Sequence, residues 1–384
     1  MDTLRVIVAA ILAAVALGAL LQLSWAYLAI PSLADVPAAR GPQPSVSVIV
    51  AARDEQRHIE VATRSLLAQT YERLELIVVD DRSVDATPEI LARLARADSK
   101  LRVLRVDRLP DGWLGKNHAL HTGAAGVTGE LLLFADADVV LAPDALSRAV
   151  RLLQLEHADH LAVAPDLVLP TWSLALVVNY FMMWFLLWLR PWKARDPRSR
   201  AYVGIGAFNL VRAAAYRAIG GHTAIALRPD DDIMLGKLLK SRGYRQIVAA
   251  GDHHEVVVEW YRSLGELARG FRKNAFAGLR YSALLTGATV VGNLMLAVWP
   301  FMAVFLTRGA ERDLYAVAAV AQMIAYAGPA MKQRTRPWLA FLYPVAAILF
   351  VGILSAAVLR TLRHRGIEWR GTRYPLDALR ANRV

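Results

Sequence analysis

The stretch "LLLFADADVV" (Leu131–Val140) has the composition of a buried β-strand that ends in charge. An uninterrupted apolar run of this length is typical of a strand covered on both faces. Two carboxylates, Asp136 and Asp138, follow the run, and a helix is expected to begin near Pro143. Buried charges require a partner. The end of this strand is therefore a candidate binding site.

The same scheme of an apolar strand, polar residues and a helix occurs upstream. The strands are "SVSVIVAARDE" (Ser45–Glu55), "LELIVVDDRSVDAT" (Leu74–Thr87) and "LRVLRV" (Leu101–Val106), and helical patterns cover Arg57–Gln69 and Pro88–Ala97. Strands that alternate with helices predict an α/β fold with a mostly parallel sheet and helices on both faces.

Charged residues follow several of these strands, and parallel pairing would place them along one rim of the sheet. Ligands of such sheets bind beyond the carboxyl ends of the strands. For Asp80 and Asp81 the alternative is helix capping and turn formation, for which aspartate is common. Two acidic pairs after two strands favour a site, because clustered carboxylates repel one another unless a cation or donors compensate. The rim residues are Arg53, Glu55, Asp80, Asp81, Asp136 and Asp138.

Asp136 and Asp138 have a spacing that suits metal ligands. In extended backbone, residues separated by one position point to the same side. Paired carboxylates that face one point suit Mg²⁺ or Mn²⁺, which also binds substrate phosphates. His253 and His254 are weaker candidates: neighbouring residues in a strand point to opposite faces, so at most one could bind the metal, and we expect that neither does. The chain has no cysteine, which excludes disulfides and thiolate metal sites.

Long apolar runs mark both ends of the chain as membrane segments. Val6–Ile30 carries no charge over roughly 25 residues, enough to cross a bilayer as a helix. The preceding residues are charge-balanced, so an anchor is favoured over a signal peptide. Three further runs are Ala283–Thr307, Leu314–Met331 and Trp338–Leu359. The expected order is an anchor (1–30), a soluble domain (31–282), membrane helices (283–360) and a basic tail (361–384).

The formal net charge of +12 suits a protein pressed against anionic lipid headgroups. It equally suits a protein that binds a polyphosphate substrate. Charge alone does not choose between these two.

The soluble segment resembles the family 2 glycosyltransferases of the GT-A fold. The resemblance covers most of Ser45–Ser282. "GWLGKNHAL" (Gly112–Leu120), "GIGAFNLVRAAAYRAIGGH" (Gly204–His222) and the flanking membrane helices are similar to the branch associated with hopanoid and carotenoid biosynthesis. The elements that carry the family resemblance are, in order, "VSVIVAARDE", "VVDDRSVDAT", "FADADV", "RPDDDIMLG" (Arg228–Gly236) and the basic helix "ARGFRKNAFAGLRYS" (Ala268–Ser282).

This resemblance implies an inverting transfer from a nucleotide-diphosphate sugar to a lipid such as a hopanoid or carotenoid, with Mg²⁺ or Mn²⁺ and without nucleic acid. It implies that Asp232 is the general base, or Asp231, because three consecutive aspartates stand where the family usually has Glu-Asp. Asp138 would be the principal metal ligand, and Asp136 would lie near the metal and the ribose. The nucleotide-sugar-binding residues would be Ala51, Arg53, Glu55, Asp80, Asp81, Lys116, Asp136, Arg269, Arg272 and Lys273.

The basic residues of this set have two interpretations. Arg269, Arg272 and Lys273 share one face of a helix through their i, i+3, i+4 spacing. They could clamp a diphosphate, or they could contact lipid headgroups just before the apolar run at Ala283. The family usually has an Arg-Trp pair here, and "RKNAF" lacks the tryptophan. Lys116, at a helix start that favours anions, is a phosphate ligand or an ordinary solvated lysine.

The aromatic-rich run "WSLALVVNYFMMWFLLWLRPW" (Trp172–Trp192) is expected to be an interfacial helix. A crossing here would place the metal pair and the base on opposite sides of the membrane. An interfacial helix would instead bring the site to the bilayer surface, where a lipid presents its hydroxyl.

We expect a multi-pass protein of the inner membrane with its catalytic domain in the cytoplasm. Four complete spans would place the tail from Arg360 outside, whereas its basic composition favours the cytosol. One run is therefore expected not to span. The candidates are Leu314–Met331, the shortest, and Ala283–Thr307, which contains Pro300 and could be bent or re-entrant.

Two other functions stay open from the sequence. A processive polysaccharide synthase would normally need more membrane helices to form a polymer channel. A non-catalytic membrane protein that only binds a nucleotide would not need Asp231 or Asp232.

Overall fold

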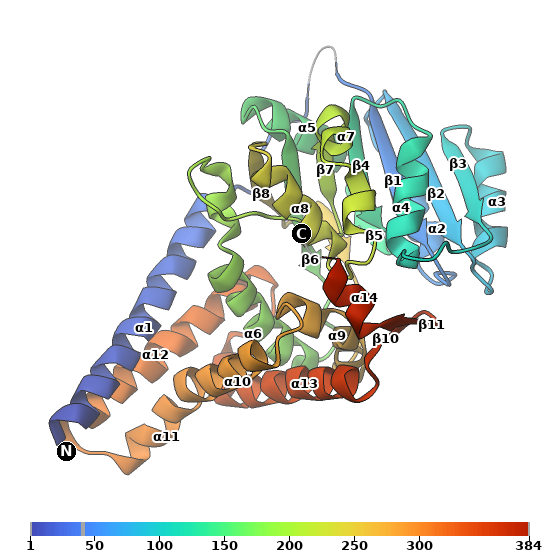
Figure 1. Cartoon of the computed structure of the whole chain (residues 1–384). Coiled ribbons are helices and arrows are strands. Elements are labelled where there is room, and N and C mark those ends of the chain that lie inside the picture. Colours follow the sequence, from blue (N-terminus) through green and yellow to red (C-terminus); the bar gives the residue numbers. More distant parts are fainter. Residues whose placement is uncertain (1, 40–42, 383–384) are drawn as a thin grey trace. The chain divides into compact units, whose positions relative to one another are not determined.

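The chain of this computed structural model divides into two compact units, and residues 2–39 and 43–382 are described. The sheet unit consists of Ile30–Val168, Pro191–Glu259 and Ala381–Val384. The helical unit consists of Met1–Ala29, Leu169–Arg190 and Trp260–Arg380. Figure 1 labels the elements of both. Each unit is thus assembled from segments that lie far apart in the sequence.

The sheet unit is built on a mostly parallel sheet. Strand β1 (Val46–Ala52) pairs in parallel with β2 (Leu74–Asp81) and β4 (Leu131–Asp136), and β2 pairs in parallel with β3 (Leu101–Val106). Within the described residues the order is β3-β2-β1-β4-β7-β6-β9-β5, with β8 beside β6. The predicted α/β fold with a mostly parallel sheet is confirmed.

The short strand β7 (Asn209–Arg212) runs against its neighbours. It is antiparallel both to β4 and to β6 (His160–Leu167). The segment that leads into β7 therefore arrives at the rim where β4 ends. Beyond β6 lie β8 (Gln246–Gly251), parallel to it, and the antiparallel pair of β5 (Val139–Leu141) and β9 (Val256–Val258).

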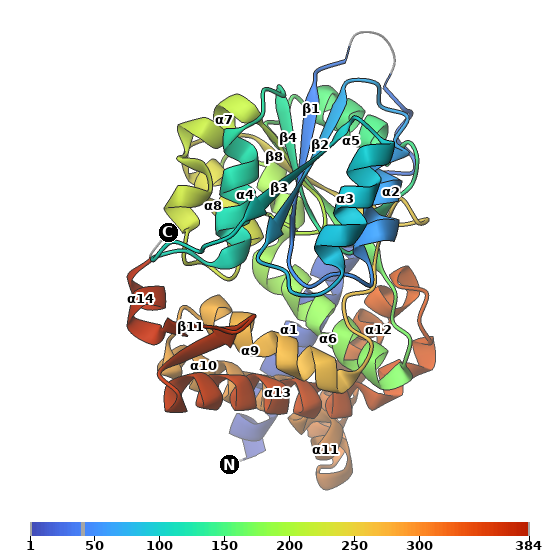
Figure 2. The same cartoon turned by 90° about the vertical axis from the view of Figure 1, so that its right-hand side faces the viewer.

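Helices cover both faces of the sheet, as Figure 2 shows. On one face lie α2 (Ile59–Leu67) and α3 (Thr87–Ala97), and on the other lie α4 (Gly115–Ala125) and α8 (Asp231–Ser241). This unit also contains α5 (Ala145–Leu155), α7 (Ala213–Ala218) and the 3-10 helices η1 (Pro191–Arg195) and η2 (Gly221–Ile225).

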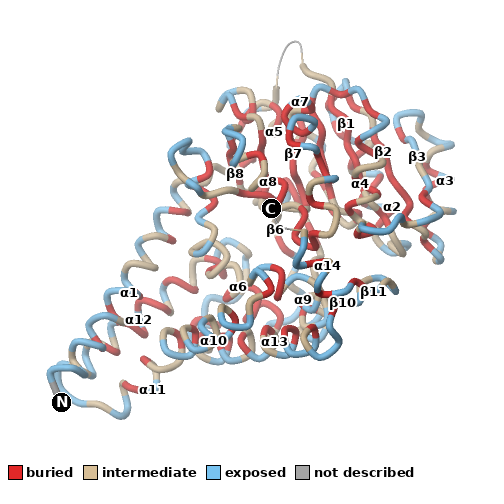
Figure 3. Tube along the Cα trace, viewed as in Figure 1, coloured by how far each residue is buried: buried red, intermediate tan, exposed pale blue. Residues whose placement is uncertain are grey.

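The core of the sheet unit lies between the strands and the helices. Figure 3 shows that the strands β1, β2 and β4 are buried along most of their length. Ile49, Val79 and Phe134 of these strands belong to one buried cluster with Leu120 of α4 and Leu235 of α8. Burial of this apolar surface fixes the strands and both helices, and with them the ends that form the rim.

The helical unit pairs its long helices through small side chains. Helix α1 (Asp2–Ala29) packs along α12 (Gly309–Lys332), with Ala13 and Ala16 against Ala318 and Ala321. Alanines allow close approach of helix backbones. Helix α13 (Tyr343–Arg363) packs against α6 (Trp172–Leu189), α9 (Leu264–Gly278) and α10 (Ala283–Ala297). The other elements of this chain region are α11 (Trp299–Leu306), η3 (Pro337–Leu342), the hairpin of β10 (Gly366–Trp369) and β11 (Thr372–Pro375), and α14 (Leu376–Ala381).

Within the described residues, four helices are long and apolar enough to cross a membrane: Thr3–Ala29, Trp172–Arg195, Gly309–Lys332 and Pro337–Arg363. Of the two runs named as candidates not to span, Ala283–Thr307 is bent, because α10 and α11 meet at an angle of 41°. The other, Leu314–Met331, lies in α12, which is long and apolar enough to span. Pro300 lies in the first turn of α11, where a proline is tolerated. The segment from Trp172, which is expected to be an interfacial helix, is also long and apolar enough to span a membrane.

Candidate functional site

The register of the sheet brings the predicted acidic residues to one rim. Ala52 of β1 is paired with Asp80, and Ala51 is paired with Asp136. Asp80 and Asp81 at the end of β2 are buried, whereas the side chain of Asp136 at the end of β4 is 39% exposed. Carboxylates therefore flank the end of β1 on both sides.

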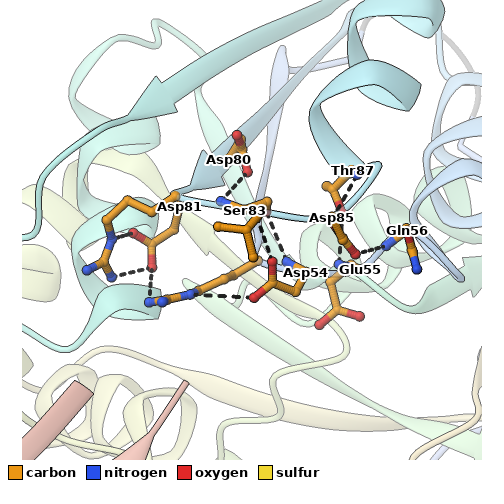
Figure 4. A network of polar contacts seen from close by, with 11 residues as sticks. Asp54, Glu55, Gln56, Asp80, Asp81, Ser83, Asp85 and Thr87 are labelled. Carbon is orange, nitrogen blue, oxygen red and sulfur yellow. Dashed lines mark hydrogen bonds and ion pairs between the residues drawn. The ribbon is translucent and has the colours of Figure 1, made fainter. Parts of the chain in front are cut away.

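The two acids at the end of β2 are part of a polar network, which Figure 4 shows. Asp81 forms ion pairs with Arg82 at 2.7 Å and with Arg53 at 3.8 Å. Oδ1 of Asp80 accepts a hydrogen bond of 3.2 Å from the backbone N–H of Ser83. Turn formation therefore accounts for one oxygen of Asp80, and the two arginines keep the charge of Asp81 compensated.

The loops after β1 and β2 hold each other in place. The N–H of Asp54 donates to Oγ of Ser83 (2.9 Å), and the N–H of Val84 donates to Oδ1 of Asp54 (2.9 Å). The N–H of Glu55 donates to Oγ1 of Thr87 (2.8 Å). These reciprocal bonds fix the predicted nucleotide-binding loops relative to one another (Figure 4).

Lys116, in the first turn of α4, connects two acidic groups. Its Nζ lies 2.8 Å from Oδ1 of Asp136 and 3.4 Å from Oδ2 of Asp231. Burial acts to lower the pKa of Lys116, but the carboxylates of Asp136, Asp231 and Asp232 outweigh it and hold the pKa above its ordinary value. Lys116 is thus a fixed positive charge between β4 and α8, and the interpretation as a solvated lysine is wrong.

The loop that leads into β7 lies between Asp136 and Asp232. The N–H of Gly206 donates to Oδ2 of Asp232 at 2.7 Å. A Cβ on Gly206 would lie 2.7 Å from Oδ2 of Asp136, and a Cβ on Gly204 would collide with the backbone carbonyl of Asp232. Glycine permits this close approach. Sequence reasoning gave these glycines no role, although their spacing in "GIGAF" was the available signal.

The three consecutive aspartates before and within α8 have different surroundings. Asp230 is buried and forms a two-point ion pair with Arg228, at 2.9 and 2.7 Å. Asp231 is paired with Lys116. Burial, followed by the charge of Asp231, raises the pKa of Asp232 to about 7. A carboxyl group with a pKa near neutrality is suited to general base catalysis.

Asp138 lies in the turn between β4 and β5. The expectation that extended backbone aligns it with Asp136 is wrong in its premise, because β4 ends at Asp136. Burial, followed by the charges of Asp136 and Glu55, raises the pKa of Asp138 to about 7. In the described part of the chain, no group of three or more His, Cys, Asp or Glu side chains is placed to hold a metal.

Asn117, next to Lys116 on α4, holds the segment that precedes α8. Its buried Nδ2 lies 2.8 Å from the carbonyl oxygen of Ile225 and 2.9 Å from that of Arg228. The N–H of Leu114 also donates to the carbonyl of Ala226 (2.8 Å). Sequence reasoning missed this function, which depends on two segments far apart in the chain.

His222 lines a small pocket together with Lys116, Asp136, Asp231 and Asp232. It is buried, and its Nδ1 is 2.8 Å from the hydroxyl of Tyr216. Burial, followed by the charge of Lys116, lowers the pKa of His222 to about 3, so the ring is neutral at physiological pH. This histidine ends the stretch Gly204–His222, and nothing in the sequence of that stretch assigns it to the site.

The predicted basic trio lies on α9, in the helical unit. The prediction of a helix here is confirmed. Arg269 and Arg272 are exposed, and Nζ of Lys273 lies 4.4 Å from the centroid of the Trp369 ring, within the range of a cation–π contact. The role of the trio in diphosphate binding stays a prediction.

His253 and His254 lie in a turn with positive φ angles of 58° and 64°. The strand argument that aimed them at opposite faces is therefore wrong. Nδ1 of His254 lies 3.5 Å from Oδ2 of Asp166 at the end of β6.

Comparison with known proteins relates the sheet unit to glycosyltransferases. Residues 47–217 match the family model for glycosyl transferase family 2. The beta-monoglucosyldiacylglycerol synthase of Trichormus variabilis is 39% identical over 126 residues, which are 32% of this chain and 26% of that protein. The 4,4'-diaponeurosporenoate glycosyltransferase of Staphylococcus haemolyticus is 37% identical over 97 residues, 25% of each chain. The matched stretches thus span about a quarter of these relatives.

A solved structure resembles nearly the whole chain. The mannosyltransferase PcManGT from Pyrobaculum calidifontis, solved with GDP-Man and Mn²⁺, has a TM-score of 0.55 and 21% identity, and the match covers 94% of this chain and 99% of that one. At this identity the similarity shows the fold, and the expected GT-A fold is confirmed.

Proposed function

We propose that this chain, whose residues 47–217 are a family 2 glycosyltransferase domain, transfers a sugar with inversion from a nucleotide-diphosphate sugar to a lipid acceptor at a membrane. One observation carries the proposal. A carboxylate with a raised pKa, Asp232, lies in one small pocket with Asp136 of the strand-end pair and with the cation Lys116. Transfer from a diphosphate donor requires a base for the acceptor and a positive charge near the departing phosphates, and here both lie at one rim.

Asp232 is proposed as the base that removes the proton from the acceptor hydroxyl. The hydrogen bond from Gly206 holds its Oδ2, which fixes the orientation of the carboxylate. Its position in the first turn of α8 stabilises the ionised form through the helix dipole. Asp230 is a poorer candidate, because Arg228 occupies both of its oxygens.

Asp136 and Asp138 are proposed to hold a divalent ion such as Mg²⁺ or Mn²⁺. Burial and the nearby charges of Asp136 and Glu55 make ionisation of Asp138 unfavourable, so a cation would relieve the repulsion. Magnesium is commonly held by one or two carboxylates together with substrate phosphates, which agrees with the small number of acids here. When bound, the ion would stabilise the charge of the departing nucleoside diphosphate. Lys116 would keep Asp136 in position.

The nucleotide is proposed to occupy the loops after β1 and β2. Arg53 and Glu55 lie in the loop after β1, and Asp80 and Asp81 are the last two residues of β2. An ion pair joins Arg53 to Asp81. Their fixed hydrogen bonds would lower the entropy lost when a nucleotide binds. The exposed arginines of α9 are kept as candidates for the diphosphate.

A lipid acceptor is proposed for two reasons. Within the described residues, four helices are long and apolar enough to span a membrane. The two relatives are named for a diacylglycerol glycolipid and for diaponeurosporenoate, which are both membrane-soluble. The acceptor we infer is the hydroxyl group of a hopanoid, a carotenoid or a similar lipid, presented to a cytoplasmic domain.

The proposal is tested with the full-length protein in detergent or nanodiscs. UDP-glucose, UDP-N-acetylglucosamine and GDP-mannose are each supplied with Mg²⁺ or Mn²⁺ and a membrane lipid extract. We expect release of nucleoside diphosphate from one donor, accelerated by the lipid. Binding of a nucleotide without turnover of any donor would favour the non-catalytic alternative, and a growing polysaccharide product would favour the processive one.

Two isosteric variants test the base. Asp232→Asn cannot accept the proton, so transfer should fall by about 10² or more while nucleotide affinity changes little. If Asp231→Asn has this effect instead, the base lies one position earlier. Asp313→Asn, at an exposed position of α12, is the control and should be silent. Full activity of both Asp231 and Asp232 variants would contradict the assignment.

A further inference from the structure

Asn382 lies at the end of the described chain and contacts the segment in front of the proposed base. Its Oδ1 accepts a hydrogen bond of 3.1 Å from the N–H of Leu227. Its Nδ2 donates to the carbonyl of Ala224 at 3.3 Å. The carboxamide of Asn382 thus binds one backbone donor and one backbone acceptor of the same segment.

The segment bound by Asn382 leads directly to the proposed catalytic acids. It begins in η2 (Gly221–Ile225), and Asp231 opens α8 only four positions after Leu227. The segment is also held by Asn117 of α4 and by the N–H of Leu114, the N-cap residue of α4. Asn382 bonds two groups, the Leu227 N–H and the Ala224 carbonyl, that these α4 contacts do not use. The path of the chain into α8 is therefore fixed by two sets of hydrogen bonds, one from Asn117 and Leu114 and the other from Asn382.

We propose that Asn382 is a positioning residue that holds the segment Ala224–Leu227 so that α8 presents Asp231 and Asp232 in a fixed place. Asn382 directly follows α14, whose residues up to Arg380 belong to the helical unit. The residue that makes the contact therefore follows the helical unit closely in the chain. The catalytic part of this inference rests on the proposed function, whereas the contact itself does not.

The physical effect of losing the contact follows from its two hydrogen bonds. Without Asn382, the N–H of Leu227 and the carbonyl of Ala224 can be satisfied by water, so the segment opens more often. The net contribution of such bonds predicts an amide exchange rate at Leu227 that is about three- to tenfold faster. The exchange of amides in β1 and β2 should not change, because these strands lie in the buried core.

The test compares three variants of the full-length protein. Asn382→Ala removes both bonds, and Asn382→Asp retains an acceptor for Leu227 while losing the donor to Ala224. Asp377→Ala, at an exposed position of α14, is the matched control. Hydrogen exchange of the peptide that contains Leu227 is measured together with kcat and KM for the nucleotide-sugar donor.

We expect exchange at Leu227 to rise in Asn382→Ala, to rise less in Asn382→Asp and to stay at the wild-type rate in Asp377→Ala. We expect kcat to fall by about two- to tenfold in Asn382→Ala, with the donor KM nearly unchanged, because the nucleotide loops are not part of the contact. Wild-type exchange in Asn382→Ala would overturn the proposed contact. Faster exchange with wild-type kcat would overturn the positioning role. A failure of the proposed function, in contrast, would show as absent turnover in the wild type with the exchange differences intact.

Discussion

Replacement of Gly206 by alanine tests whether the positions of the Asp136 and Asp232 side chains depend on this glycine. The added Cβ would lie 2.7 Å from Oδ2 of Asp136 and 3.4 Å from its Cγ. Carbon and carbonyl-type oxygen normally approach to about 3.3 Å, so the carboxylate would have to retreat by about 0.6 Å. Gly206 lies outside the positive-φ region, so alanine adds no backbone strain of that kind.

The expected loss of activity follows from this displacement. A misplacement of 1 Å in an active site can cost about 10²-fold in rate, so about 0.6 Å predicts a loss of about ten- to thirtyfold in kcat. The movement should also weaken the ion pair of 2.8 Å between Asp136 and Lys116. We expect the melting temperature to change little, because Asp136 is partly exposed and can move towards solvent.

The assay is single-turnover transfer from the donor identified by the nucleotide-sugar panel, with the melting temperature as a check on folding. Gly126→Ala is the control, because its Cβ would find Arg102 Nη2 only at 4.0 Å. A folded Gly206→Ala protein with the kcat of the wild type would refute the view that Gly206 sets the position of Asp136.

Three further predictions concern the metal, pH and topology. Asp138→Ala should abolish donor turnover while the protein remains folded, and full wild-type activity in excess chelator would contradict a role for a divalent ion. The proposed base acts when deprotonated, and the pKa of Asp232 is raised to about 7. The transfer rate should therefore increase as pH rises through about 7 and then level off. A rate that does not change between about pH 5 and about pH 8 would argue against Asp232 as the base. Single cysteines, Ser241→Cys and Ala381→Cys, are both exposed and should both resist an impermeant thiol reagent on intact cells; labelling at Ala381→Cys alone would place the tail outside.

The strands of the sheet unit could be predicted because their signal is local. The run that ends at Asp136 is apolar because it is covered on both faces, and the same holds for the run that ends at Asp81. The order of apolar runs and helical patterns therefore predicts the alternation of strands and helices from β1 to β3 correctly. The rim followed from the general rule that parallel strands end on one side.

Contacts between distant segments could not be predicted in this way. The ion pairs of Lys116 depend on how α4 and α8 meet across the end of β4, and no spacing in the sequence records that distance. The same holds for Asn117 and for Asn382, whose partners lie more than a hundred residues away. The turns at Asp138 and at His253 escape prediction for a different reason, because both follow strands closely, where a continued extended backbone is the simpler expectation.

The reversed strand β7 has a consequence for how such a site can vary. In a purely parallel sheet, the rim receives only segments that leave strands, so each strand contributes one loop. Because β7 runs the other way, the rim also receives the segment that enters it, and the Gly204–Gly206 loop comes to lie against both Asp136 and Asp232. Changes of length before Asn209 would thus reshape the surroundings of Asp136 and of the proposed base, while the loops after β1 and β2 keep their own hydrogen bonds. Because β7 is inverted, the proposed nucleotide-binding residues and the surroundings of the proposed base come from different segments, so either set can change without the other.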